Sequence, residues 1–565
     1  MVDLGGEFCR AKSRALISCI QERSSKYFEE VHKDSFLMLR QVIDAEPWRN
    51  IPIDIDEHGG ILGLIKLNLS RAQVASAAKQ KIRVRGLPNA TTDSTDEQQQ
   101  RVSILKTYAL HGNPFTLLSE DSEATSVSSS SNSTMNIIDV LFGEETSAVN
   151  ATKKKHMSAA VVTQSCLNGL VQLVGKYSQT MYIVKSASSD IFTHLCQLFD
   201  FYICSVFNGF VSIEQRQRLL SSTKENAPPP DAAKDFEALD SFTSRVSDSP
   251  VPGQLEISIS QIFGTPHVLM DHSDINIDGS AASTIRGKNA LDEHLVAAES
   301  CWFAANVMKE MKPKLFRLLP ETSHVECTKY IDELQKVVGQ LQALVYRGIC
   351  PQLCLSNSLA ARIVDVQWDI KKQGDAPNAW VELIVSNCRE VWDYLNENNE
   401  FALVHELARE QTWMELCQAA YDIVLDTFSK SKKNNALGST TTSSDACRQG
   451  ILIDLAELQS SLDNVHSCRP ARGKEYVEEY VRATGLSDDD MMQWVRSNWQ
   501  MYAYCHMKAL ISQTLASVMK KTKLKECLLI LDGLYDQEQT FKEGPKKRRS
   551  FLLLMMEKYL MNVLL

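Results

Sequence analysis

The stretch from His156 to Phe210 constrains the fold of this 565-residue chain more than any other. Serine and aspartate residues at 186–190 favour a helix start, so residues 156–215 are predicted to form a central helical pair. Apolar residues fill more than one face of its second half, so we expect other helices to enclose it. The apolar residues on which this prediction depends recur at helical intervals: Val162, Cys166, Leu170, Val174, Tyr177, Met181, Phe192, Leu195, Phe199, Tyr202, Val206 and Phe210.

Helical spacing also predicts helices on both sides of the central pair. Residues 1–50 are predicted to be a helical segment, and residues 286–540 a C-terminal helical bundle. Strand-like alternation is not sustained anywhere in the chain, so the predicted fold class is all-α, with elongated helical bundles and long disordered linkers. Within the C-terminal bundle we expect helices at 289–319 (ending at Pro313 or Pro320), 331–345, 359–371, 379–396, 402–429, 451–465 and 475–484, and a last group from 488 to about 534.

Two stretches lose the helical spacing and are predicted to be linkers. Residues 51–155 include a serine-rich part at 116–134, which is too poor in apolar side chains to offset the entropy of ordering. Residues 216–285 contain Pro228–Pro230 and several Asp and Ser residues, so a loop or a second linker fits there.

The last stretch, residues 541–565, is an atypical basic and apolar tail. Lys546–Arg549 forms a basic cluster, and a mostly apolar run follows it from Phe551 to Leu565. Such a tail could lie on an anionic membrane surface, although it is too short to span a bilayer. The alternatives are a terminal helix docked on the bundle and a basic run without a role.

Composition excludes several classes of protein. The formal net charge of −10 argues against a general nucleic-acid binder, so no nucleic-acid partner is expected. The fifteen cysteines include no CxxC pair, which fits a reducing, cytosolic compartment better than a disulfide framework. The charged start of the chain lacks the apolar core of a signal peptide, and no apolar run approaches the ~20 residues of a membrane-spanning helix.

The segment Gly169–Lys176 is similar to a phosphate-binding loop but departs from it in spacing. Five residues rather than four separate Gly169 from Gly175, and Tyr177 stands where a Ser or Thr would hold magnesium. We also expect no strand before the segment. It is therefore predicted to be a packed helix in which the glycines allow another helix to approach closely.

Candidate metal ligands do not reach the spacing of a zinc site. His405 and Glu406 begin a zinc-protease-like helix signature, but Arg409 stands where the second histidine must come one turn later. Two further pairs lack a second pair at zinc-ligand spacing, so core packing is predicted for both: Cys350 with Cys354, and His194 with Cys196.

The acidic run Asp488–Asp490 suggests the carboxylates of a helical magnesium enzyme that acts on diphosphates. That chemistry needs carboxylates to return on the same face one turn later, whereas Met491 and Met492 follow. Ser487 as an N-cap, with acidic residues in the first turn, explains the same sequence. We therefore predict no catalytic, cofactor-binding or metal-binding residue, and the sequence identifies no partner-binding residue.

Several segments of the chain form a recognisable series, in order and with matching spacing: Gly6–Cys9, Tyr27–Phe28, Trp48, Asn113–Phe115, Leu173–Tyr177, Gln197–Tyr202, Val366–Asp369, Lys474–Glu478, Asp490–Met491 and Trp494. This series resembles the C-terminal half of the syndetin family. The resemblance covers most of residues 6–535 apart from the two linkers, and no single motif is diagnostic.

The resemblance implies a non-enzymatic subunit of a multisubunit vesicle-tethering complex, which acts in endocytic recycling of cargo from endosomes to the plasma membrane. Implied partners are the shared subunits of that complex, SNAREs and small GTPases, with peripheral membrane association and no cofactor. The implied location is cytosolic and peripheral on recycling endosomes, extending to the trans-Golgi network. The family's N-terminal half has no counterpart here, so residues 1–50 are expected to end a truncated N-terminal region.

Three alternatives remain open at this point. The first is a peripheral membrane-binding helical scaffold that uses the tail. The second is a subunit of a related Golgi-directed retrograde tether. The third is a helical enzyme, which needs clustered acidic residues or a metal site in the folded bundle.

Overall fold

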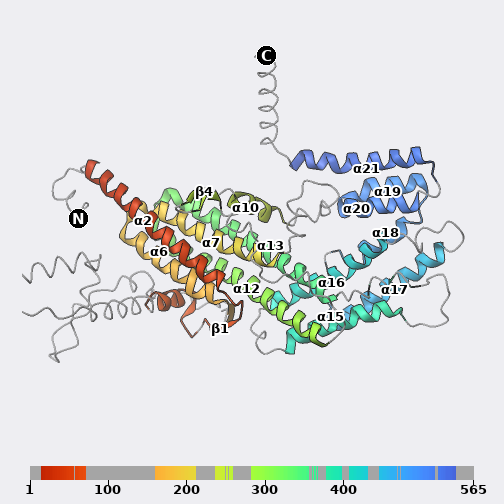
Figure 1. Ribbon diagram of the computed structural model, residues 1–565, viewed down its shortest axis with the longest axis horizontal. Helices are drawn as coiled ribbons and strands as arrows, with labels where there is room; N and C mark the ends of the chain where they lie inside the picture. Colours follow the sequence, from red (N-terminus) through yellow and green to blue (C-terminus); the bar gives the residue numbers. More distant parts are fainter. Residues whose placement is uncertain are drawn as a thin grey trace, which may run out of the picture.

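The structure is a computed structural model that covers most of the predicted helices. In this part of the chain nearly all elements are helical and form an elongated molecule (Figure 1), so the predicted all-α class is confirmed. The serine-rich stretch at 116–134 and the tail beyond residue 542 lie outside the described residues. The described residues are 14–55, 57–70, 159–211, 236–247, 250–251, 254–258, 281–354, 359, 362–363, 366, 377–397, 406–430, 444–467, 469–470, 472–515 and 519–542.

The first of two packed units is the N-terminal bundle. A smaller helix, α10 (Glu237–Ser247), packs at the edge of this unit on α13 (His324–Cys354). The main helices of the N-terminal bundle are α2 (Arg14–Asp44), α6 (Gln172–Ile183), α7 (Ser188–Phe210), α12 (Ala281–Leu318) and the first half of α13 (His324–Cys354).

The helix α7 is enclosed within the N-terminal bundle. Every side chain from Leu198 to Phe207 is buried except that of Asp200, which is half-buried. The prediction that other helices surround the second half of the central stretch is therefore confirmed. The predicted break is confirmed as well, since the 3₁₀ turn η3 (Lys185–Ala187) separates α6 from α7.

Two short antiparallel ribbons accompany the helices. The strand β1 (Ile51–Asp54) pairs with β2 (Ala159–Val162) and so joins the end of α2 to the start of the central stretch. The strands β3 (Pro250–Val251) and β4 (Gln254–Ser258) form the second ribbon.

These elements correct three predictions. Residues 51–70 are not a linker, because β1 is followed by a helix over residues 60–70, and Val162 lies in a strand rather than a helix. The alternating Ile53 and Ile55 are both buried, which is the period-two pattern of a half-buried strand. The predicted linker at 216–285 likewise contains α10, and apolar side chains are buried at helical spacing along it and at the residue before it: Phe236, Leu239, Phe242 and Val246.

The helix α12 passes through Pro313 and ends at Leu318, shortly before Pro320. The prediction that Pro313 could end it is wrong. Pro313 lies on the exposed side of the helix, where water can replace the backbone hydrogen bond that proline cannot make. Packing on the buried side of α12 therefore outweighs the local cost of the proline.

The helix α13 belongs to both packed units. Near its start, the Tyr330 hydroxyl donates to Asp200 Oδ1 of α7 at 2.9 Å. Near its other end, Arg347 donates two hydrogen bonds to Glu415 of α16 (Glu406–Lys430), at 2.7 and 3.1 Å. The predicted helix-packing seam of α13 is confirmed, since all its members are buried: Ile331, Leu334, Val338, Leu341 and Val345.

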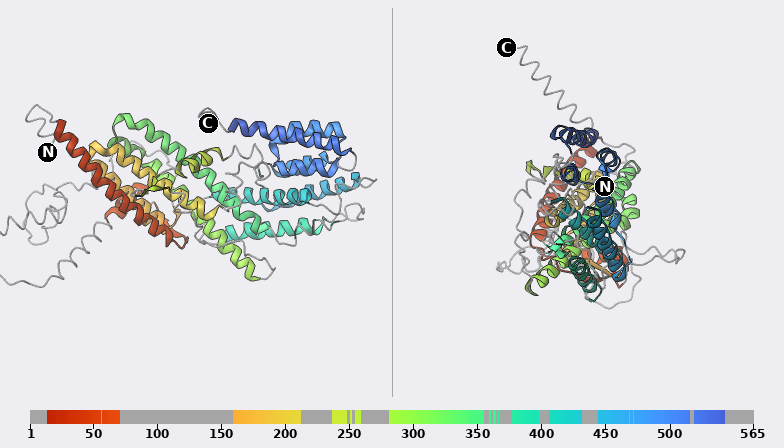
Figure 2. Two further views of the ribbon diagram at one scale, coloured as in Figure 1. Left: turned by 45° about the horizontal axis from the view of Figure 1, so that its top comes forward. Right: turned by 90° about the vertical axis from the view of Figure 1, so that its right-hand side faces the viewer.

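The second packed unit, the C-terminal bundle, surrounds α16. The structure confirms most helices predicted here, and of the helix predicted at 359–371 only residues 359, 362–363 and 366 are described. The packing crosses the border expected at residue 286, because α12 and α13 contact helices of the N-terminal bundle (Figures 1 and 2). The other helices of the C-terminal bundle are α15 (Ala379–Glu397), α17 (Ser444–Val465), α18 (Gly473–Ala483), α19 (Asp488–Asn498), α20 (Tyr504–Thr514) and α21 (Lys521–Lys542).

A buried histidine fastens α2 to the central pair. With a proton on Nε2, His32 donates to Gln197 Oε1 at 3.1 Å, and its Nδ1 accepts from the Tyr177 hydroxyl at 2.7 Å. The His194 ring lies 4.4 Å from that of His32, centroid to centroid. Burial and the neighbouring His194 lower the pKa of His32 to about 3, against a smaller opposite effect of Gln197.

We predict that His32 makes the N-terminal bundle sensitive to acid. Because its folded pKa lies below its unfolded value, the stability that neutral His32 contributes is present above about pH 6.5 and is lost as the pH falls toward 3. His32→Leu should cost about 1–3 kcal/mol at neutral pH, since it leaves the Tyr177 hydroxyl without its acceptor. When urea unfolding is followed by circular dichroism, the free energies of unfolding of wild type and His32→Leu should converge as the pH falls.

Tyr177→Phe is the matched control for this experiment. It removes the same hydrogen bond but keeps the titrating histidine, so the acid sensitivity should remain. If the free energies of unfolding of wild type and His32→Leu changed in parallel with pH, His32 would not be the source of the acid sensitivity.

Candidate functional site

The glycines of the phosphate-loop-like segment lie inside helices. Gly169 belongs to the π-helix η2 (Ser165–Val171), and Gly175 to α6. A Cβ at Gly169 would come within 3.1 Å of Leu39, and one at Gly175 within 3.3 Å of Ile65. The prediction of close helix approach is confirmed, whereas the expectation of no preceding strand is wrong, because β2 ends at Val162, shortly before η2 begins. The helical backbone leaves no loop that could surround a phosphate.

The candidate zinc ligands are engaged in other contacts or lie outside the described residues. His405 and the side chain of Cys354 are not described, and Arg409 donates to Asn396 Oδ1 at 3.1 Å. Cys350 is fully buried, as predicted for core packing. Within the described residues, no three His, Cys, Asp or Glu side chains gather in a way that could hold a metal ion.

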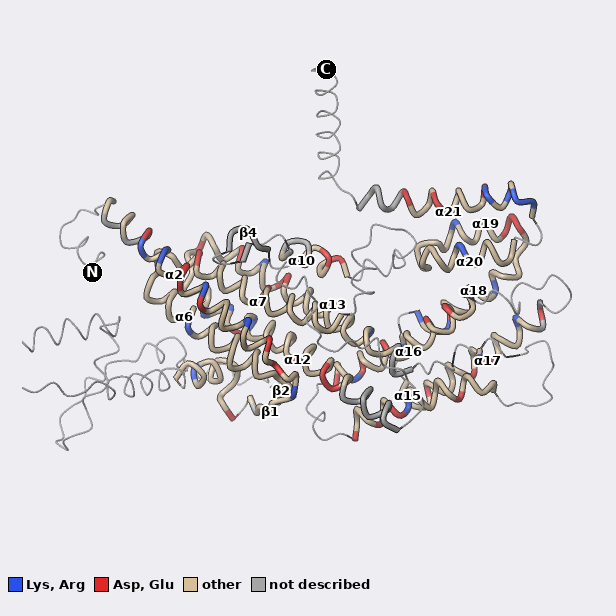
Figure 3. The backbone as a smooth tube through the Cα atoms, in the orientation of Figure 1, with Lys and Arg blue, Asp and Glu red and all other residues tan. Residues whose placement is uncertain are grey.

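The acidic run at the start of α19 is a helix cap, as predicted. The Ser487 hydroxyl accepts from the Asp490 backbone N–H at 3.4 Å, and all three aspartates lie in the first turn. The start of α21 beside it carries lysines (Figure 3), and Lys523 Nζ lies 4.0 Å from Asp489 Oδ1. Opposite charges at these helix starts therefore face each other, which accounts for the run without catalysis.

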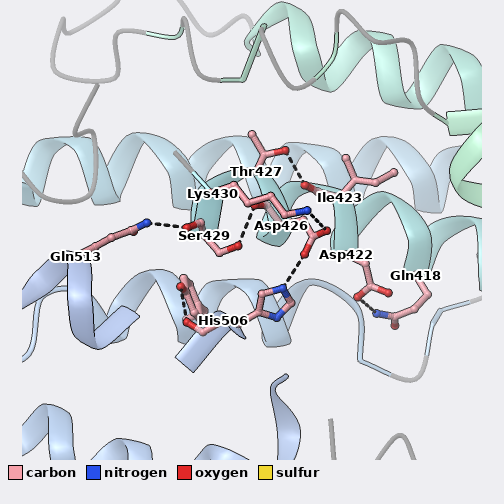
Figure 4. Close-up of polar contacts among 10 residues, drawn as sticks. Gln418, Asp422, Ile423, Asp426, Thr427, Ser429, Lys430, His506 and Gln513 are labelled. Atoms are coloured by element: carbon pink, nitrogen blue, oxygen red, sulfur yellow. Dashed lines mark hydrogen bonds and ion pairs between the residues drawn. The ribbon is translucent and has the colours of Figure 1, made fainter. Parts of the chain in front are cut away.

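The most developed polar site in the C-terminal bundle joins α16 to α20 (Figure 4). We call it the α16–α20 junction and define it by Asp426, Ser429, Lys430, His506 and Gln513. His506 Nε2 donates to Asp426 Oδ1 at 2.7 Å, and Lys430 Nζ donates to Asp426 Oδ2 at 3.0 Å. Gln513 Nε2 donates to the Ser429 carbonyl at 2.6 Å. Both ends of α20 are thus hydrogen-bonded to one turn of α16.

Tyrosines extend the junction to α18. The Tyr480 hydroxyl donates to the His506 carbonyl at 3.0 Å, and the Tyr502 hydroxyl donates to the Tyr476 carbonyl at 2.7 Å. The rings of Tyr476 and Tyr502 stack with centroids 4.6 Å apart. The helix α18 and the segment from Tyr502 to His506, which leads into α20, therefore each supply a ring or hydroxyl and a carbonyl to the other, which fixes their relative position.

Charge at the junction favours an ionised Asp426. Burial alone would raise its pKa, but the hydrogen bond and charge of His506, together with Lys430, lower it to about 2. Asp422, one turn earlier, behaves in the opposite way, because burial raises its pKa despite a hydrogen bond from Gln418. The two aspartates therefore differ in role although they lie on the same side of α16.

The junction has the His–Asp pair of a hydrolase but not its nucleophile. The hydroxyls of Thr427 and Ser429 donate to carbonyls of their own helix, at 2.8 and 2.9 Å. Neither hydroxyl is hydrogen-bonded to His506, so this arrangement does not activate a nucleophile. The junction holds helices together, and sequence analysis missed it because Asp426 and His506 are 80 positions apart.

We predict that Asp426→Asn weakens the C-terminal bundle whereas Asp422→Asn does not. Loss of the Asp426 charge should cost about 1 kcal/mol at neutral pH, because Asp426 is partly exposed and solvent screens the pair. Since the folded pKa of Asp426 is depressed, its contribution is present above about pH 4 and disappears as the pH falls toward 2.

Urea titrations near neutral pH and near pH 3 measure both effects. The loss of unfolding free energy that Asp426→Asn causes relative to wild type should be smaller near pH 3 than near neutral pH. Asp422→Asn removes a carboxylate that burial penalises, so equal destabilisation by both variants would contradict the assignment.

No described helix is both long enough and apolar enough to cross a membrane. The basic and apolar tail falls outside the part of the chain to which this finding applies.

Comparison with known proteins finds a family model that matches part of the helical region. Residues 288–532 match the family described as syndetin, C-terminal. Syndetin of Gallus gallus is 23% identical over 576 residues, which covers 94% of this chain and 57% of that protein. Syndetins of Mus musculus and Rattus norvegicus are each 22% identical over 581 residues, covering 94% of this chain and 56% of each relative.

This chain thus spans only a little over half the length of the relatives it matches. The residues that match the syndetin C-terminal family begin in α12 and end in α21. The resemblance predicted from the sequence is confirmed, since residues 288–532 of this chain match the syndetin C-terminal family and most of the chain is similar to syndetins.

Proposed function

We propose that this chain is a non-catalytic subunit of an endosomal vesicle-tethering complex that acts in endocytic recycling of cargo to the plasma membrane. The observation that carries the proposal is the similarity to syndetins along 94% of the chain, with the family's C-terminal region at residues 288–532. The proposed partners are the shared subunits of the complex, SNAREs and small GTPases, at the surface of recycling endosomes.

The architecture supports a scaffold. Two bundles are joined through α13 into an elongated body (Figure 2), so surfaces at its two ends are held at a fixed separation. The polar contacts of the α16–α20 junction hold helices together rather than present reactive groups. A tether needs this property, because it has to hold a vesicle-bound partner at a distance from a membrane-bound one.

The purified chain should retain tethering-complex subunits and SNAREs when a cell extract is passed over it and the bound proteins are identified by mass spectrometry. We expect a chain lacking residues 377–542, which contain α15 to α21, to lose these partners. The deletion starts after α13 because the N-terminal bundle needs α12 and α13. Circular dichroism checks that the shortened chain remains helical.

A chain that ends at residue 542 is the matched control, since it lacks only residues outside the described structure. It should bind like the full chain. Capture of neither tethering subunits nor SNAREs by the full chain would contradict the proposal, and so would full binding after the 377–542 deletion.

The alternative of a membrane-binding scaffold makes a separate prediction. If the tail anchors the chain, the full chain should float with vesicles that contain anionic lipid, and the chain that ends at residue 542 should not. Equal flotation of the two chains would remove the tail from membrane binding.

A further inference from the structure

A buried carboxyl group lies between two long helices, α12 and α13. Glu299 of α12 is only 5% exposed. Its Oε1 accepts two hydrogen bonds from α13, one from Gln342 Nε2 at 3.0 Å and one from the Tyr346 hydroxyl at 2.9 Å. Gln342 is 7% exposed and Tyr346 is fully buried, so little water reaches the three groups.

Both donors to Glu299 are uncharged. Within the described residues Glu299 forms no ion pair. Arg347, which follows Tyr346 in α13, is already bound to Glu415 through two hydrogen bonds. A buried carboxylate without a cation loses more free energy by desolvation than two neutral hydrogen bonds return, so the protonated form is favoured.

We propose that Glu299 is a proton-binding site between α12 and α13, which holds a proton on the acid side of neutrality and releases it on the alkaline side. Ionised Glu299 then needs water, and the α12–α13 contact loosens to admit it. The contact lies between the middle of α12 and the second half of α13, the helix that joins the two bundles, so the proton controls how firmly the elongated body is held. This inference does not depend on the proposed tethering function.

The charged and titratable surroundings of Glu299 support this assignment. Burial raises the pKa of Glu299 to about 7, and the hydrogen bonds from Tyr346 and Gln342 offset only part of that effect. Two neighbouring groups are coupled to its charge, Tyr346 on α13 and Cys301 on α12, and burial raises the pKa of both well above their ordinary values. Both therefore stay neutral near pH 7, and the proton exchanged there belongs to Glu299.

The sign of the pH dependence follows from the raised pKa. A group that binds a proton more tightly in the folded chain contributes stability that is complete below its unfolded pKa of about 4.5 and is lost as the pH rises through about 7. The N-terminal bundle of the wild type should therefore weaken between mildly acidic and mildly alkaline pH. His32 acts in the opposite direction, over the acid range.

Glu299→Gln tests the proposal directly. The glutamine keeps the size of the side chain and an oxygen that accepts from Gln342 and Tyr346, but it has no proton to lose. Thermal unfolding is compared at about pH 5.5 and about pH 8.5. The variant should unfold several degrees above the wild type at the alkaline pH, and the difference should shrink or reverse at the acid pH.

Infrared spectroscopy observes the proton itself. The difference spectrum between wild type and Glu299→Gln should contain the carbonyl band of a protonated carboxyl group at mildly acidic pH, and this band should disappear with a midpoint near pH 7. Tyr346→Phe removes a donor that favours the ionised form, so it should move the midpoint to higher pH.

Glu29→Gln is the matched control, because Glu29 is an exposed glutamate on α2 of the same bundle. It should change neither the dependence of thermal unfolding on pH nor the midpoint at which the carboxyl band disappears. The proposal is overturned if no protonated carboxyl band appears at mildly acidic pH, or if wild type and Glu299→Gln show parallel stability profiles.

Discussion

The packing of α12 against α13 is the interaction on which the rest of the structure depends. Every residue of α12 from His294 to Cys301 is buried, so this part of the helix has no face left for solvent. The helix α13 covers it and continues to α16, where Arg347 and Glu415 form a largely buried ion pair. A continuous helix is stiff over this length, so the orientation of one bundle relative to the other is set by the path of α13.

Local periodicity was sufficient to predict the helices that carry this packing. The seam of α13, the enclosed part of α7 and the Ser487 cap all depend on residues within a few positions of each other, and all are found. The failures have a different origin. The strand at Ile51–Asp54 is too short for its alternation to stand out, and Pro313 is tolerated only because its side of α12 faces solvent. Whether one face of a helix is exposed depends on how the bundle packs, and the spacing of residues along the sequence does not reveal it.

The polar contacts could not be predicted in the same way. Glu299 and Tyr346 are 47 positions apart, and Asp426 and His506 are 80 apart. Whether the two residues of each pair come into contact depends on which helices are neighbours and on how far each helix is displaced along its axis. The sequence does contain one usable signal, because Glu299 is an acidic residue within a run of small and apolar residues from Leu295 to Ala305. An acid at such a position must find donors or remain protonated, and this structure shows the donors, Gln342 and Tyr346.

The positions of these polar groups suggest why an elongated helical scaffold keeps them. Apolar ridges and grooves repeat every turn, so two helices packed through apolar side chains alone can slide by one turn at modest cost. A buried polar pair permits one register only, since sliding would leave a donor or a carboxylate without its partner. Glu299 fixes α12 on α13, Glu415 fixes α13 on α16, and Asp426 fixes α16 on α20. These contacts form a chain from one bundle to the other, so registry at each step sets the distance between the ends of the molecule.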